Sequence, residues 1–488
     1  FSNPPTSLLF SGSGDFFSLL SVSALGFLLF IPDNRINKSV QAMTLSNNDQ
    51  KNDDQETILL ARQCVLDMLS NILDRRCALD ITLDSNNVFA SLDARDRGFA
   101  RMLLTTTLRH LGQIDDLITF AQDRPDSLKT PVIRNILRLG VTQLFFMDVP
   151  DHASVDTSVR LADVVGMSGH KGFVNGVLRK LSREGSRRIQ KQDAGRLNTP
   201  EWLLKIWIAD YGMNVAAQIA QSHLCEAPLD ITIKNKQELD YWAEALQALP
   251  LKTGSLRRMK GGSVRELEGF DKGQWWVQDA AAAIPATLFG DIDGREVFDL
   301  CAAPGGKTLQ LASMGAKVTA IDRSAKRLKR LEENLERMDL AHHVKIEVAD
   351  AAEWNPIEAP RYLLLDAPCS ATGTIRRHPD NPYLKSPKDI EGLRTIQERL
   401  LNHAGAILET GGVLIYCTCS LQKDEGERQV ERFLARHPNF IRMPVRAAEI
   451  GGYDELINEH GDLRILPSML AMHGGMDGFF VSRLTKKN

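Results

Sequence analysis

The first strong pattern is a helical one. Apolar residues recur every three or four positions between Glu56 and Leu181, as amphipathic helices require. Breaks at Pro125, Pro131, Pro150 and Gly169 divide this segment into several helices joined by short loops. The positions that carry the period include Ile58, Ala61, Val65, Leu69, Ile72 and Leu73, and then Ala100, Leu103, Leu104, Leu108 and Leu111. We therefore expect a small all-α domain over residues 56–190.

A shorter and mixed pattern follows in residues 191–270. The alternation of Leu229, Ile231 and Ile233 predicts a strand, and the glycines at 261–262 and 269–273 predict turns. This region is expected to be a small α/β connector.

In residues 271–488 strand-like and helix-like runs alternate. The strand-like runs are VFDL, KVTAID, VKIEVAD, RYLLLDAP and GVLIYCTCS, and the intervening segments include helical patterns over 324–338 and within 388–408. Strands that alternate with helices predict a doubly wound, mostly parallel sheet of the Rossmann-like α/β class. In such a sheet, ligands bind at the carboxyl ends of the strands.

The first 42 residues read differently from the rest of the chain. Their apolar stretch, 16–31, is shorter than the roughly 20 residues of a membrane-spanning helix, and no basic residue precedes it as in a secretory signal. Met43 stands before a polar run, SNNDQKNDDQ. We expect residues 1–42 to be upstream sequence translated in frame, Met43 to be the start, residues 1–55 to form a non-native or disordered extension, and no membrane partner.

Charge adds one local feature. The 59 Lys and Arg residues nearly balance the 62 Asp and Glu residues, and a net charge of −3 gives no general attraction to nucleic acid. Positive charge accumulates only over 171–196, where eight basic residues face two acids. Arg187, Arg188 and Lys191 in this run are candidates for RNA phosphate contacts, and a solvated helix face is the alternative.

The seven cysteines exclude a secreted disulfide framework, because their number is odd and their spacing irregular. No Cys-x-x-Cys pair is present, and the neighbouring His342 and His343 lack the spacing of a helical zinc site. We expect a reducing, cytoplasmic location and no metal.

The segment DLCAAPGGKT, 299–308, follows a predicted strand and opens a helix. Two glycines let the backbone approach a ligand, and the helix amino terminus favours a negative group. A nucleotide-triphosphate loop needs glycine six residues before its lysine, but Cys301 stands there before Lys307, and the dinucleotide pattern Gly-x-Gly-x-x-Gly is also missing. The remaining interpretations are a loop for a methyl donor such as S-adenosylmethionine or a structural turn.

Two acids stand in register with that loop. Asp322 ends the next strand, where a carboxylate can accept both hydroxyls of a ribose, and Asp350 ends the third, within reach of an adenine amino group. A lone acid is more often a solvated loop residue or a helix cap. Together with the glycine turn, the two acids outline an adenosyl pocket.

Two further strand ends carry thiols. DAPCSATG (366–373) places Cys369 after the fourth strand, and CTCS (417–420) places Cys419 after the fifth. A single buried cysteine is usually a small packing residue, but two at adjacent strand ends beside a donor pocket suggest chemistry. Carbon 5 of cytosine becomes nucleophilic when a thiolate adds to carbon 6, and Asp366 is placed to supply or orient a proton at ring nitrogen 3.

These motifs resemble the bacterial 16S ribosomal RNA cytosine-C5 methyltransferases of the RsmB, or Sun/Fmu, type, within the Nol1/Nop2/Sun family. The resemblance extends from Glu56 to the carboxyl end. Within it, GFVNGVLRKL (172–181) resembles part of the NusB-like RNA-binding domain.

The resemblance implies a class I methyltransferase domain and specific roles for its residues. Cys419 takes the position of the nucleophile and Cys369 that of the cysteine that promotes product release, a division that spacing alone leaves open, while Cys417 is expected to pack. Arg376 and Arg377, in the loop RRHPD, are candidates for RNA phosphate contacts or for a solvated loop. The expected S-adenosylmethionine contacts are Cys301, Ala302, Ala303, Pro304, Gly305, Gly306, Lys307, Asp322, Asp350 and Asp366.

The implied reaction is S-adenosylmethionine-dependent methylation of carbon 5 of a cytidine in 16S ribosomal RNA, by a protein expected to be monomeric. A transfer RNA substrate stays open, because the same family contains tRNA methyltransferases. A non-catalytic RNA-binding or assembly protein is a further alternative, but such a protein is expected to lose Cys419, Cys369 or Asp366, and all three are present. A transcription antitermination factor has no use for two aligned thiols.

Overall fold

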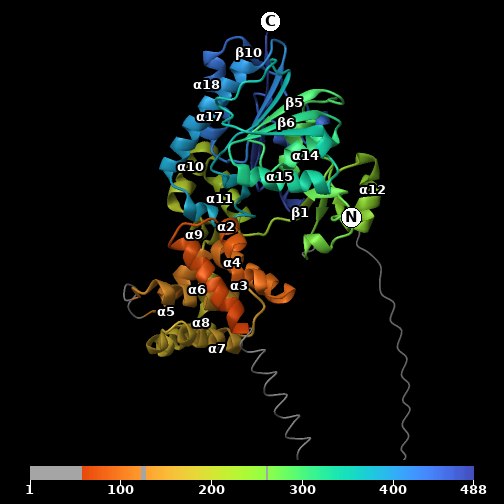
Figure 1. The fold of residues 1–488 in the computed structure, drawn as a ribbon. Coiled ribbons are helices and arrows are strands. Elements are labelled where there is room, and N and C mark those ends of the chain that lie inside the picture. The colour runs from red at the N-terminus through yellow and green to blue at the C-terminus, as the bar shows by residue number, and fades with distance from the viewer. Residues whose placement is uncertain (1–57, 123–127, 260–261, 488) are drawn as a thin grey trace, which may run out of the picture. The chain divides into compact units, whose positions relative to one another are not determined.

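The computed structural model describes residues 58–122, 128–259 and 262–487 (Figure 1). The expectations for residues 1–42, for Met43 and for the extension 1–55 lie outside these ranges. Within them, no helix combines the length and the apolar character that crossing a membrane requires.

Helices build the amino-terminal part, as the apolar period predicts. Val65, Leu69 and Leu103 lie in one apolar core, and Asp93 caps α4 by accepting a hydrogen bond from the backbone N–H of Asp96 at 2.7 Å. Residues 58–73 are helical, and α2 (Leu79–Ser85), α3 (Asn87–Ser91), α4 (Ala94–Arg109), α5 (Leu111–Ala121), α6 (Pro131–Phe145), α7 (Asp151–Val164) and α8 (Lys171–Ile189) follow.

The connector combines helices with a small antiparallel sheet whose strand order is β2-β3-β1-β4. Asp230 on β1 and Arg257 on β3 form a completely buried ion pair at 2.6 Å that joins two of its strands. Its elements are α9 (Ala194–Asn198), α10 (Glu201–Tyr211), α11 (Met213–Ser222), β1 (Leu229–Ile233), α12 (Leu239–Ala245), β2 (Leu249–Pro250), β3 (Leu256–Arg258) and β4 (Trp275–Val277).

The third part is the expected mixed sheet with helices, in the order β10-β12-β9-β8-β5-β6-β7, with β11 paired to β12. The five strands from β9 to β7 are parallel, whereas β10, β11 and β12 join antiparallel. The elements are α13 (Ala280–Thr287), β5 (Glu296–Leu300), α14 (Gly306–Ser313), β6 (Lys317–Asp322), α15 (Ala325–Arg337), β7 (Val344–Val348), β8 (Tyr362–Asp366), α16 (Asn381–Leu384), α17 (Pro387–Ile407), β9 (Val413–Thr418), α18 (Glu427–Arg436), β10 (Phe440–Arg442), β11 (Leu463–Ile465) and β12 (Phe479–Lys486).

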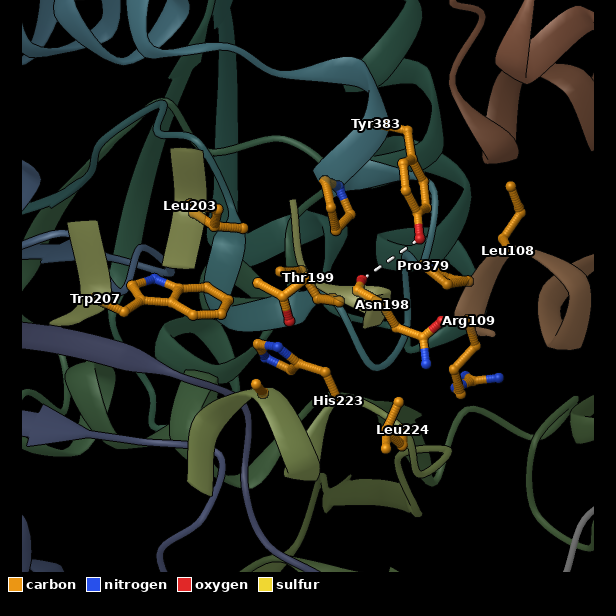
Figure 2. Close-up of a pocket in the computed structure, with 13 residues that line it drawn as sticks. Leu108, Arg109, Asn198, Thr199, Leu203, Trp207, His223, Leu224, Pro379 and Tyr383 are labelled. Atoms are coloured by element: carbon orange, nitrogen blue, oxygen red, sulfur yellow. Dashed lines mark hydrogen bonds between the residues drawn. The ribbon is translucent and has the colours of Figure 1, made fainter. Parts of the chain in front are cut away.

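Contacts of α16 and the loop before it tie the sheet domain to the helical part. Asp380 accepts a hydrogen bond from the backbone N–H of Leu79 at 2.8 Å, and Arg109 donates to the carbonyl of Arg376 at 2.7 Å. A small cavity of about 20 Å³ lies at this junction. Figure 2 shows its lining residues, among them His223 and Tyr383. None of those residues belongs to the sets predicted for the cofactor or for catalysis, so the chemistry must be sought at the strand ends.

Candidate catalytic site

The loop 301–307 leads from β5 into α14. Gly305 precedes the first residue of the helix with a φ of 106°, a left-handed conformation that side chains rarely adopt. A Cβ atom there would also lie 2.3 Å from the Leu331 side chain, so the packing of α15 requires glycine at this position. The backbone N–H groups of the first turn of α14 therefore begin at the carboxyl end of β5.

Asp322 is buried at the end of β6 and is bonded to this loop. Its carboxylate accepts hydrogen bonds from the backbone N–H groups of Ala303 at 3.2 Å and Ser324 at 2.9 Å. The guanidinium of Arg327 also approaches Oδ2, at 3.6 Å, which is an ion pair rather than a hydrogen bond, so the carboxylate keeps acceptor capacity for a ligand beside this cation. Asp350 differs, since its carboxylate is partly exposed and pairs with Arg399 at 2.6 Å.

Lys307 connects the loop to the end of β8. Its Nζ lies 2.8 Å from Asp366 Oδ2, and its side chain is nearly buried. Burial disfavours the charged form, but the adjacent Asp366 outweighs this effect and raises the pKa of Lys307. Cys417 donates to Asp366 Oδ1 at 3.5 Å, and burial raises the pKa of this thiol, in agreement with the packing role expected for it.

The two thiols of the predicted pair meet. The sulfur atoms of Cys369 and Cys419 lie 3.4 Å apart, and either can donate the hydrogen bond. Both side chains are half-buried. The hydrogen bond with Cys419, followed by burial, raises the pKa of Cys369 well above its ordinary value.

A buried carboxylate that the sequence did not reveal lies behind this pair. Glu425 accepts hydrogen bonds from the Ser370 N–H at 2.9 Å, the Ser370 hydroxyl at 2.5 Å, the Ser420 hydroxyl at 2.6 Å and Gln397 at 2.9 Å. Ser370 and Ser420 directly follow Cys369 and Cys419. In the sequence, Glu425 sits in a charged run with no sign of burial.

Asp299, on β5 just before the loop, is also completely buried. One oxygen accepts a hydrogen bond from Thr308 at 2.6 Å, and the other has no partner among the residues described. Burial raises the pKa of Asp299 to about 7.

The structure places the predicted phosphate-binding residues in two different environments, and the first pair is Arg376 and Arg377. Arg377 pairs with Asp279 at 2.6 Å and with Asp477 at 2.8 Å, and the buried Arg376 donates to the Gly474 carbonyl at 2.6 Å. The Arg376 guanidinium is therefore buried, whereas Arg377 is half-buried between two acids, so neither side chain extends freely into solvent as the sequence suggested.

The three basic residues of the helical part are placed differently. Arg187 and Lys191 are exposed and form no ion pair within the described ranges, whereas Arg188 pairs with Asp116 at 2.6 Å. Two of the three are thus free to meet a phosphate.

Comparisons with known proteins give the family context. Residues 286–485 match the family model described as 16S rRNA methyltransferase RsmB/F, and residues 59–183 match the NusB family. A ribosomal RNA small subunit methyltransferase B from Pseudomonas putida is 33% identical over 433 residues, which cover 86% of this chain and 96% of the relative. A probable enzyme of the same name from Synechocystis is 32% identical, over 88% of this chain and 100% of the relative.

Two solved structures show the same fold. The crystal structure of PH0851 covers 88% of this chain and 99% of its own, with a TM-score of 0.70 and 22% identity. The structure of NSun6 from Pyrococcus horikoshii with SFG covers 59% of this chain and 98% of its own, with a TM-score of 0.51 and 20% identity.

Proposed function

The chain belongs to the RsmB/F family of 16S rRNA methyltransferases, and from this premise we propose that it methylates carbon 5 of a cytidine in 16S ribosomal RNA through a covalent cysteine adduct. The observation that carries the proposal is the distance of 3.4 Å between the sulfur atoms of Cys369 and Cys419 beside the Lys307–Asp366 pair. A methyltransferase acting on a good nucleophile needs no thiol, whereas carbon 5 of a pyrimidine needs one.

The loop and acid side chains fit S-adenosylmethionine. The first turn of α14 offers backbone N–H groups to a carboxylate, and buried Asp322 keeps acceptor positions for ribose hydroxyls. We assign Cys301 to Lys307, Asp322 and Asp366 to this pocket, with Asp350 at its more exposed, adenine side. When bound, this cofactor supplies an electrophilic methyl group.

Cys419 is proposed to act as the nucleophile. The thiol proton passes to water, the sulfur adds to carbon 6, and the displaced electron pair makes carbon 5 an enamine carbon. This carbon would take the methyl group of the bound sulfonium cofactor, which would leave as the thioether S-adenosylhomocysteine. Asp366, held by Lys307, faces ring nitrogen 3 and orients the base or supplies its proton.

Cys369 is proposed to complete the reaction. The proton on carbon 5 passes to a water next to the Cys369 sulfur, the C–H electron pair restores the double bond between carbons 5 and 6, and the Cys419 sulfur leaves with the electrons of its bond to carbon 6. The spacing of the two sulfurs supports this sequence of events, because both must reach adjacent ring carbons.

A labelling experiment tests reaction and substrate together. The purified protein is incubated with methyl-labelled S-adenosylmethionine and either undermodified 16S RNA or tRNA, and the nucleosides are separated. Label in 5-methylcytidine from 16S RNA is expected. Label from tRNA alone would overturn the substrate, and label in another nucleoside, or none, would overturn the reaction.

A further inference from the structure

A cleft of about 540 Å³ lies where the helical part, the connector and α16 meet. We call it the junction cleft. It contains none of the residues assigned above to the cofactor or to catalysis. Its lining includes Lys129, Arg134 and Lys385, together with the aromatic residues Trp202 and Tyr383.

Positive charge dominates this lining. Lys129, Arg134 and Lys385 form no ion pair with any described residue, and Arg138 is held by Asp115 at 2.6 Å. Asp74 is the one acid among the lining residues. In a chain with a net charge of −3, such a local excess of cations favours an anionic partner over a neutral or basic one.

Two aromatic side chains accompany the cations. Trp202 on α10 and Tyr383 on α16 line the cleft from separate segments. Cations that meet phosphates, together with aromatic rings that stack on bases, are the combination by which proteins hold single-stranded nucleic acid. Double-stranded RNA, by contrast, is recognised through its backbone and groove shape without stacking on side chains.

The cleft is connected to the catalytic loop by α16. Asn381, at the first position of this helix, donates to the carbonyls of Ser370 at 3.1 Å and Ala371 at 2.7 Å, directly after Cys369. Tyr383, two residues along the same helix, lines the cleft. A strand bound in the cleft would therefore rest on the element that holds the Cys369 loop.

We infer that the junction cleft binds a single-stranded segment of the RNA substrate, with Lys129, Arg134 and Lys385 at its phosphates. This inference rests on the proposed function for the identity of the RNA.

The test replaces the two exposed or half-exposed lysines, Lys129→Gln with Lys385→Gln, and compares a matched control, Lys236→Gln with Lys272→Gln, in the connector. Binding of a 16S RNA fragment is measured at several salt concentrations, and kcat and KM of methylation are measured alongside. The cleft variant should raise Kd and KM about tenfold and lower the salt slope by about 1.4, or 0.7 for each single-stranded phosphate contact, with kcat nearly unchanged. The control should match the wild-type protein.

Unchanged Kd, KM and salt slope in the cleft variant, with an active wild-type protein, would overturn the inference. So would tighter binding of an acidic peptide than of RNA. A wild-type protein that binds RNA with the predicted slope but methylates none would instead overturn the proposed function, so the two failures are distinguishable.

A second and independent observation concerns Glu425. Its buried carboxylate binds the residues after both thiols at once, through Ser370 and Ser420, and Gln397 holds it from α17. The geometry points to Glu425 as a positioning residue that fixes the spacing of Cys369 and Cys419, and this rests on the proposed roles of those cysteines.

The variant Glu425→Gln keeps the shape but places an N–H₂ group against hydroxyl and amide donors, and exposed Glu431→Gln on α18 is its control. Among protein that remains folded by circular dichroism, kcat should fall about tenfold while the KM for RNA stays unchanged. An unchanged kcat in the folded Glu425→Gln protein would reduce Glu425 to a structural role, and a raised KM with normal kcat would also contradict positioning. If the wild-type protein forms no 5-methylcytidine, that result contradicts the proposed function itself rather than the role of Glu425.

Discussion

The three acids at the strand ends have different hydrogen-bond and ion-pair partners, and these partners indicate a different role for each acid. Asp366 is paired with a lysine, Asp322 is bound by backbone N–H groups, and Asp299 has one oxygen without a partner among the residues described. A buried carboxylate without a compensating cation prefers its protonated form. Asp299 therefore suits a structural role below the loop, while Asp322 and Asp366 remain available to ligands.

The free energy of unfolding should depend on whether the Asp299 carboxyl group is protonated. Its pKa of about 7 in the folded protein lies above the ordinary value of 3.8, so its contribution is fully present below about pH 4 and is lost as the pH rises through 7. Relative to Asp299→Asn, the wild-type free energy of unfolding should fall by about 2–3 kcal/mol between pH 5 and pH 8. Urea unfolding of both proteins at the two pH values measures this, and a pH-independent difference would show that Asp299 is ionised throughout.

Cys419→Ala should abolish methylation. Removing the attacking sulfur leaves carbon 5 without activation, so turnover should fall more than about a thousandfold. Cys417→Ala, two residues away and buried, is the matched control and should affect folding more than chemistry. Activity of Cys419→Ala within tenfold of the wild-type rate would remove the nucleophile from this position.

Contacts between neighbouring strand ends could be predicted from the sequence, whereas contacts between residues far apart in the chain could not. Strand ends can be read from local pattern, and the proximity of Cys369 and Cys419 follows from parallel neighbours, as their separation of 3.4 Å bears out. The partners of Arg377 lie about 100 residues away in either direction, so the local sequence of its loop gave no sign that Asp279 and Asp477 pair with it.

The spacing of apolar residues predicted most of the helices and the parallel strands of the fold. Ser324 and Met338 flank α15 (Ala325–Arg337) as cap residues, and the five predicted strand runs correspond to β5 to β9. The antiparallel β10, β11 and β12 were not predicted, because their short or continuous apolar runs carry no alternation that marks their partners.

The connector sheet should depend on one ion pair. Arg257 donates to Asp230 and to the carbonyls of His473 and Gly475, and its side chain is completely buried. Arg257→Ala leaves Asp230 buried and unpaired, and should lower the free energy of unfolding by about 3–5 kcal/mol. Lys205→Ala, which breaks the exposed pair with Glu201, should cost less than about 0.5 kcal/mol. Equal losses in the two variants would contradict the importance of burial here.

For the whole molecule, the proposed function requires a weakly acidic chain to hold RNA. Among the cations that form no ion pair in the described residues, two groups are candidates for this role: Arg187 and Lys191, on α8 and just after it, and the lysines and Arg134 of the junction cleft. Binding should therefore depend on salt through a few local contacts rather than through the net charge.

The variant Arg187→Gln with Lys191→Gln should weaken RNA binding uniformly across sequences and lower the salt slope by about 1 for each lost contact. Arg188→Gln serves as the control, because Arg188 is already paired with Asp116 and should change the slope little. Filter binding at several salt concentrations gives both slopes. An unchanged slope in the double variant would show that Arg187 and Lys191 do not contact RNA phosphates.

In the proposed mechanism, Cys419 forms the covalent bond to RNA and Cys369 promotes its release. The most direct measurement uses Cys369→Ala with 16S RNA and S-adenosylmethionine, separates the products on a denaturing gel and locates the cross-linked residue by mass spectrometry. We predict a slowly migrating protein–RNA band in which the nucleotide is attached to Cys419. Attachment to another cysteine, or the absence of any adduct while the wild-type protein produces 5-methylcytidine, would contradict the account.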